Sequence, residues 1–174
     1  MLAIILVYGI IAGAIVIASM LIGLALGGDA GASVWAGYLI MLAGLSLVFV
    51  GIKRYRDREL GGVIRFGTAF KLGIGIAVAA SVAYVIGWEI NLALTDYRFI
   101  DQYAEGIVEA KRAAGASAAE IAKTQAEMAT LKAQFANPAI RVGFTLLEIL
   151  PVGLVVALVS AALLRNSKLL PART

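Results

Sequence analysis

Four long apolar blocks, separated by polar segments, dominate the pattern of hydrophobic and polar positions along the chain. They cover about residues 2–26, 34–52, 66–94 and 140–164. About 20 apolar residues carry a helix across a bilayer, and a single open strand cannot satisfy its backbone polar groups in lipid. We therefore predict an all-α integral membrane protein with four transmembrane helices, which form a single domain over residues 1–174.

The first block contains no charged residue over its whole length. It is longer than the apolar region of a signal peptide, which has about 7–15 residues, and no basic stretch precedes it. We therefore expect it to be a permanent span and not a cleaved signal.

The longest polar stretch, residues 95–138, lies between the third and fourth blocks. Apolar residues recur in it at helical spacing on both sides of Gly115. Ser117 and Glu120 form an S-x-x-E capping box that starts a second helix, and Asn137 with Pro138 marks either its end or a kink into the fourth span. We predict a helical hairpin outside the membrane. It is either a connector whose apolar stripes pack on each other, or a lid or docking element for a partner.

Composition narrows the chemistry that the chain can perform. Of 174 residues, 61% are hydrophobic and 15% are charged, whereas a soluble domain has about a quarter of its residues charged. Cysteine and histidine are both absent, which removes disulfides, Cys/His zinc sites and imidazole catalysis. No nucleotide-binding spacing is found. We expect no enzyme activity, no cofactor, no metal site and no nucleic-acid binding.

Lysine and arginine gather in the loop after the second block and in the tail after the fourth. These are Lys53, Arg54, Arg56, Arg58 and Arg65 in the loop, and Arg165, Lys168 and Arg173 in the tail. Such segments stay on the cytoplasmic side of a membrane. Since four spans place the loop and the tail on the same side, we predict that both termini are cytoplasmic.

The basic loop has a second interpretation besides setting the orientation. Lys53, Arg54, Arg56 and Arg58 stand just inside the predicted membrane boundary, where they are candidate contacts for anionic lipid headgroups. The sequence leaves both interpretations open.

A carboxylate, Glu148, interrupts the apolar run "FTLLEILPVGLVV", three residues before Pro151. A charge at the centre of a span costs roughly 2.5–3.5 kcal/mol, so we expect Glu148 to face the bundle or water. Glu89 near the end of the third span and Arg141 at the start of the fourth lie in the same half of the membrane. The three residues are a candidate proton or cation pocket, and the alternative is a glutamate that only fixes packing.

Glycines repeat at four-residue spacing in the first block, where Gly9 pairs with Gly13 and Gly23 with Gly27. Small residues at this spacing let two helices approach closely. The close contact lies either within one bundle or between the chains of a homo-oligomer, and the sequence does not decide between them.

Three long segments are similar to a known family. "FVGIKRYRDRELGGVIRFGTAFKLGIGI", "YVIGWEI" and "FANPAIRVGFTLLEILPVGLVVALVSAALLRN" resemble a bacterial four-span membrane family catalogued as domain of unknown function number 4199. The resemblance runs from about residue 9 to residue 173. It implies a multi-pass protein of the bacterial cytoplasmic (inner) membrane, and it brings no activity and no site residues.

Two classes of function follow from these features. The first is a small transporter or channel subunit, as a homo-oligomer, that uses the acidic pocket of the outer leaflet. The second is a non-transporting interaction or assembly module that acts through the hairpin or the basic loop.

Overall fold

The computed structural model describes residues 1–25 and 34–171, which form six α-helices and no strand. They are α1 (Leu2–Ala25), α2 (Val34–Glu59), α3 (Phe66–Leu94), α4 (Phe99–Ala113), α5 (Ala118–Phe135) and α6 (Pro138–Leu164). Four of them, α1, α2, α3 and α6, are long and apolar enough to cross a membrane. The predicted all-α class with four spans is confirmed.

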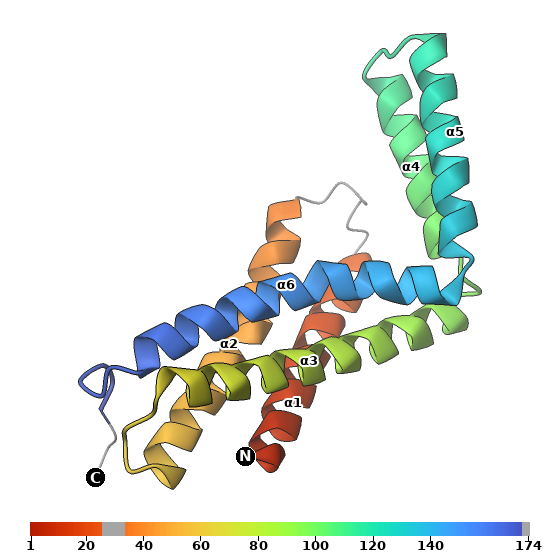
Figure 1. Ribbon diagram of the computed structural model, residues 1–174. Coiled ribbons are helices and arrows are strands. Elements are labelled where there is room, and N and C mark those ends of the chain that lie inside the picture. The colour runs from red at the N-terminus through yellow and green to blue at the C-terminus, as the bar shows by residue number, and fades with distance from the viewer. Residues whose placement is uncertain (26–33, 172–174) are drawn as a thin grey trace.

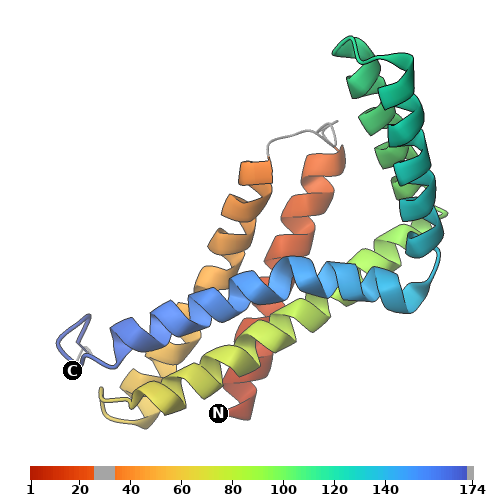
Figure 2. The same cartoon turned by 45° about the horizontal axis from the view of Figure 1, so that its top comes forward.

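The four long helices form two pairs. Helices α1 and α2 lie side by side, and the pair α3 and α6 crosses them (Figure 1). The hairpin of α4 and α5 projects from the place where α3 ends and α6 begins, in both views (Figure 2). The start of α1, the α2–α3 connection and the end of α6 lie on the opposite side from the hairpin. This arrangement is the one that four successive membrane crossings require.

Helix α2 continues past the end of its apolar block, at residue 52, as far as Glu59. Lysine, arginine and glutamate are good helix formers, and the basic side chains of Arg56 and Arg58 in the last turn interact favourably with the helix dipole. The chain then turns sharply at Gly61 and Gly62, whose φ angles are +62° and +90°.

Close packing of α1 on α3 depends on Gly9 and Gly13. A Cβ atom at Gly9 would lie 2.4 Å from the Cβ of Ala79, and one at Gly13 would lie 2.4 Å from the carbonyl oxygen of Ala80. These two glycines therefore make a contact within one chain. Gly23 has no atom within 4 Å of a built Cβ, and Gly27 lies outside the described residues.

The hairpin begins and ends where the sequence indicates. The Ser117 hydroxyl accepts from the backbone N–H of Glu120, and the Glu120 carboxylate accepts from the backbone N–H of Ser117, so the predicted capping box is confirmed. Asn137 caps α6, with Pro138 in its first turn. Helices α4 and α5 pack mainly on each other, and α5 makes a smaller contact with α6.

Candidate functional site

Arg141 on α6 and Glu89 on α3 form a bidentate ion pair. Arg141 donates from Nε to Oε1 of Glu89 at 2.8 Å and from Nη2 to Oε2 at 2.6 Å. The Arg141 side chain is 5% exposed and that of Glu89 is 27% exposed. Paired, planar donors and acceptors of this kind fix the orientation of both groups as well as their distance.

The same guanidinium connects the bundle to the base of the hairpin. Arg141 Nη1 donates to the backbone carbonyl of Phe135, the last residue of α5, at 3.0 Å. Its central carbon lies 4.9 Å from the ring centre of Tyr97 and 5.7 Å from that of Phe135. One side chain on α6 therefore contacts α3, α5 and the α3–α4 connection.

A strained backbone holds Tyr97 in this position. Asp96 and Tyr97 both have positive φ angles, +51° and +56°, a conformation that costs a non-glycine residue roughly 1–2 kcal/mol. The Tyr97 N–H donates to the carbonyl of Leu92 at 2.8 Å, which closes the end of α3. Strain of this kind persists only where the surroundings enforce it.

Aromatic rings fix the hairpin base from the side of α4. The ring of Phe99, in the first turn of α4, meets the buried ring of Trp88 edge to face at 4.8 Å, and it lies 6.4 Å from the ring of Phe135. Edge-to-face pairs stabilise beyond the area that they bury. The hairpin base is thus held by an ion pair, a carbonyl and an aromatic cluster.

Glu148 does not join this cluster. It lies two turns below Arg141 on α6, about 10 Å along the helix axis at 1.5 Å per residue. In residues 1–25 and 34–171, no hydrogen bond or ion pair connects it to Glu89 or Arg141. Its side chain is exposed, and its carboxylate lies beside the hydroxyl of Tyr84 on α3.

The Tyr84 hydroxyl also lies 3.0 Å from the sulfur of Met20 on α1. A phenol has one proton to donate, and this hydroxyl donates it to the thioether of Met20. Of the three residues of the predicted pocket, the structure therefore brings together Glu89 and Arg141 and places Glu148 next to a different polar group.

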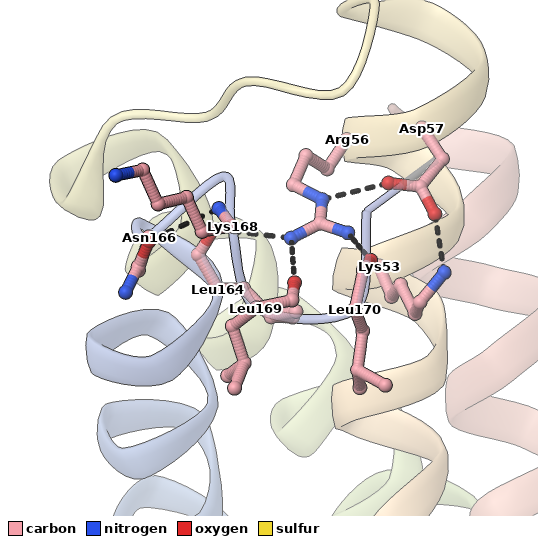
Figure 3. Close-up of polar contacts among 8 residues, drawn as sticks. All are labelled: Lys53, Arg56, Asp57, Leu164, Asn166, Lys168, Leu169 and Leu170. Carbon is pink, nitrogen blue, oxygen red and sulfur yellow. Dashed lines mark hydrogen bonds and ion pairs between the residues drawn. The ribbon is translucent and has the colours of Figure 1, made fainter. Parts of the chain in front are cut away.

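At the other end of the bundle, Arg56 is completely buried. Figure 3 shows its guanidinium pointing from α2 to the segment that follows α6. Arg56 Nε donates to Asp57 at 2.7 Å, and its two terminal nitrogens donate to the carbonyls of Leu164, Leu169 and Leu170 at 3.5, 3.0 and 2.5 Å. Arg56 therefore holds the C-terminal segment against α2.

The four candidate headgroup contacts thus have different environments. Arg56 presents no surface to a lipid, and Lys53 is paired with Asp57 at 2.5 Å, with 31% of its side chain exposed. Arg54 and Arg58 are exposed. The headgroup interpretation is therefore restricted to Arg54 and Arg58, with a smaller contribution from Lys53.

Sequence reasoning missed the contacts of Tyr97, Phe135 and the C-terminal segment. Tyr97 carried a signal, because an aromatic residue at the end of a span is typical of the membrane interface. The sequence gives no sign of which carbonyls accept hydrogen bonds from Arg56 and Arg141, since every residue has a carbonyl.

Comparison with known proteins leaves the function open and settles the family. No curated protein and no solved structure matches the chain. The model of one family, described as "Protein of unknown function (DUF4199)", matches residues 7–166. That range includes all four apolar helices almost entirely, as well as the hairpin. The chain therefore belongs to the DUF4199 family.

Proposed function

We propose that this chain is a non-enzymatic protein of the bacterial cytoplasmic membrane that holds its α4–α5 hairpin outside as a docking element for a second protein. The observation that carries the proposal is the fixation of the hairpin base by Arg141. One guanidinium binds Glu89 of α3 and the last carbonyl of α5 and packs on Tyr97. Fixing the base sets the direction in which the hairpin projects, which favours a docking element.

The size of the hairpin supports the same view. The end of α3 and the start of α6 lie close together (Figure 1), so a few residues suffice to join them. Helix α5 has 18 residues, which is about 27 Å of helix at 1.5 Å per residue. Because α4 and α5 pack mainly on each other, most of this length adds little to the core of the bundle.

A shallow hollow of about 290 Å³ between α4 and α5 gives the hairpin a contact surface. Ala104, Val108 and Met128 form its apolar part, and Glu105 and Glu109 line it from α4. An apolar centre with a polar rim is typical of protein–protein interfaces.

The charges of this hollow favour a partner segment with basic residues. Lys132, which also lines the hollow, is paired with Asp101 at 2.5 Å. Of the other charged residues that line the hollow, two are acidic, Glu105 and Glu109, and one is basic, Arg112. Complementary charge steers association and selects partners.

Photo-crosslinking in intact cells tests the proposal. A photoreactive residue at Gln125, which lines the hollow, should give one product with a second protein, and the same residue at Lys123, which does not line it, should not. Replacing Glu105 and Glu109 by lysine should remove the product and leave the thermal unfolding temperature unchanged. Equal products from both positions, or a product that survives the charge reversal, would argue against docking in this hollow.

The orientation is part of the proposal and is supported by the lysine and arginine asymmetry. In an otherwise cysteine-free chain, Ser117→Cys should react with an impermeant thiol reagent added outside intact cells, and Arg58→Cys should not. The reverse pattern would place the hairpin in the cytoplasm and overturn the proposed orientation.

Transport is the second candidate function, and the position of Glu148 supports it. An ionisable group within a span is a functional-site hypothesis by default, and Glu148 lies beside the Tyr84 hydroxyl without a cationic partner among the described residues. If Glu148 carries protons or cations, Glu148→Gln should abolish the flux of protons or cations into liposomes that contain the protein. The thermal unfolding temperature should be unchanged. Glu127→Gln on the hairpin is the matched control. Absence of flux through the unmodified protein would remove this candidate.

A further inference from the structure

A second hollow lies under the hairpin, where its base meets the ends of α3 and α6. It has a volume of about 470 Å³, which is within the range of ligand-binding pockets, about 300–1,000 Å³. Residues from the α3–α4 connection, the start of α4, the end of α5 and the start of α6 line it. We propose that this hollow, called the junction pocket below, binds a phosphate–ammonium zwitterion, the headgroup of phosphatidylethanolamine.

The depth of the junction pocket fits a lipid headgroup. Tyr97 follows the last residue of α3, Leu94, by three positions, and Pro138 and Arg141 stand at the start of α6. A tyrosine at the end of a membrane helix lies at the level of the headgroups. The pocket is therefore open where the bilayer changes from acyl chains to phosphates.

The charges of the junction pocket point to a ligand that carries both signs. Its charged lining groups are Asp96 and Asp101 on one hand and Lys132 and Arg141 on the other. Two of these groups have ion-pair partners that do not line the pocket, Arg98 for Asp96 and Glu89 for Arg141. With these partners counted, the formal charges cancel, so a simple anion or a simple cation gains no net attraction. A zwitterion, in contrast, can place its ammonium at the carboxylates and its phosphate at the cations.

The rim can open to accept such a ligand. Lys132 and Asp101 bind each other at 2.5 Å, but 44% and 51% of their side chains are exposed. Asp96 is paired with Arg98 at 3.2 Å, with exposures of 78% and 68%. Exposed ion pairs are weak. Each of these groups can therefore exchange its present partner for a ligand group that carries the same charge as that partner.

The floor of the pocket offers further donors in a fixed position. Three of the five N–H groups of Arg141 are engaged, two with Glu89 and one with the Phe135 carbonyl. The remaining two belong to the terminal nitrogens of a guanidinium that lines the pocket. Arginine donors in a rigid fork match the geometry of phosphate oxygens.

The strained connection also points to the pocket. Asp96 and Tyr97, the two neighbouring residues with positive φ, both line it. Their conformation brings a carboxylate to the rim and an aromatic face to the wall above Arg141. An ammonium group interacts favourably both with a carboxylate and with an aromatic face.

Native mass spectrometry of the whole protein, released from nanodiscs made with equal amounts of phosphatidylethanolamine and phosphatidylglycerol, tests the proposal. We expect phosphatidylethanolamine to be retained preferentially. Asp96→Asn and Lys132→Gln should each weaken that retention about tenfold, the effect of one lost hydrogen bond to a charged group. Glu127→Gln and Lys123→Gln, on the exposed surface of α5, should retain as much as the unmodified protein.

Free phosphoethanolamine, titrated into the detergent-solubilised protein, distinguishes the two sources of the zwitterion. Binding of this compound and its loss in Asp96→Asn would assign the site to a free zwitterion, and retention of the lipid alone would assign it to the membrane. Equal retention of both lipids, or preference for phosphatidylglycerol, would overturn the proposal. So would unchanged retention in both pocket variants, provided that their unfolding temperatures equal that of the unmodified protein.

Discussion

Arg141 and Glu89 are 52 positions apart in the chain, and two hydrogen bonds of 2.8 and 2.6 Å join their side chains. The pair links the end of α3 to the start of α6, the two helices that carry the hairpin, and it neutralises two of the three charged residues predicted to form a pocket. This ion pair separates the residues that concern the hairpin from the residue that concerns transport. Glu89 and Arg141 fix the base of the hairpin, and Glu148 is left to be tested for transport.

The ion pair should be measurable as an energetic coupling. Glu89→Gln and Arg141→Gln should each lower the free energy of unfolding in detergent by about 3 kcal/mol, because each leaves a largely buried charge without its partner. The double variant should cost about 2 kcal/mol less than the sum of the two. The exposed pair of Lys123 and Glu127, 3.9 Å apart, is the control, and its coupling should be close to zero. Equal coupling in the two pairs would contradict a structural role for Arg141.

Close contact between α1 and α3 predicts opposite effects for two alanine substitutions. In Gly13→Ala, the new Cβ meets the Ala80 carbonyl oxygen at 2.4 Å, so we expect a loss of about 1–3 kcal/mol from overpacking. In Gly23→Ala, the new Cβ meets nothing, and a gain of about 0.5–1 kcal/mol follows from the better helix propensity of alanine. Thermal unfolding in detergent measures both, and effects of the same sign would refute the packing.

Local patterns in the sequence predicted the spans, the hairpin and its capping box, because each depends on residues within a few turns of one another. The contact of Gly9 and Gly13 with α3 was left open. The glycine spacing shows that another helix can approach closely, but it does not identify that helix. The partner of Arg141 was also open between Glu89 and Glu148. It depends on how α3 and α6 are aligned, which no local pattern contains.

Arg56 illustrates the limit most clearly. Its position in a basic segment predicts exposure at the membrane surface, and Arg54 and Arg58 are exposed. Arg56 instead faces the C-terminal segment, where backbone carbonyls 108 to 114 positions away accept its hydrogen bonds. Carbonyls are present at every residue and are invisible to composition and spacing.

The capping box makes the start of α5 sensitive to pH. Hydrogen bonds from the hydroxyl and the backbone N–H of Ser117 hold the pKa of Glu120 below its ordinary value of 4.5. A carboxylate with a lowered pKa in the folded state stabilises that state above pH 4.5, and the contribution is lost as the pH falls through the lowered pKa. We expect amide exchange in the first turn of α5, corrected for the intrinsic rate, to accelerate over this interval.

Ser117→Ala serves as the control for that pH dependence. It removes the hydroxyl that caps α5, so exchange in the first turn should be about fivefold faster at pH 7, as for other lost N-caps. It should also flatten the pH dependence, because Glu120 loses one of its donors. An unchanged profile in this variant would show that the pH effect arises elsewhere in the chain.

The burial of Arg56 makes a final prediction about the C-terminal segment. Arg56→Gln removes the donors that hold the carbonyls of Leu164, Leu169 and Leu170, so the segment should detach from α2. Trypsin should then cleave after Lys168 at least tenfold faster than in the unmodified protein, since each lost bond to a charged donor is worth roughly 1.5–3 kcal/mol. Arg54→Gln makes the same change at an exposed position two residues earlier and should leave the rate unchanged. Intact-protein mass spectrometry follows the cleavage, and equal rates in the two variants would mean that Arg56 does not hold the segment.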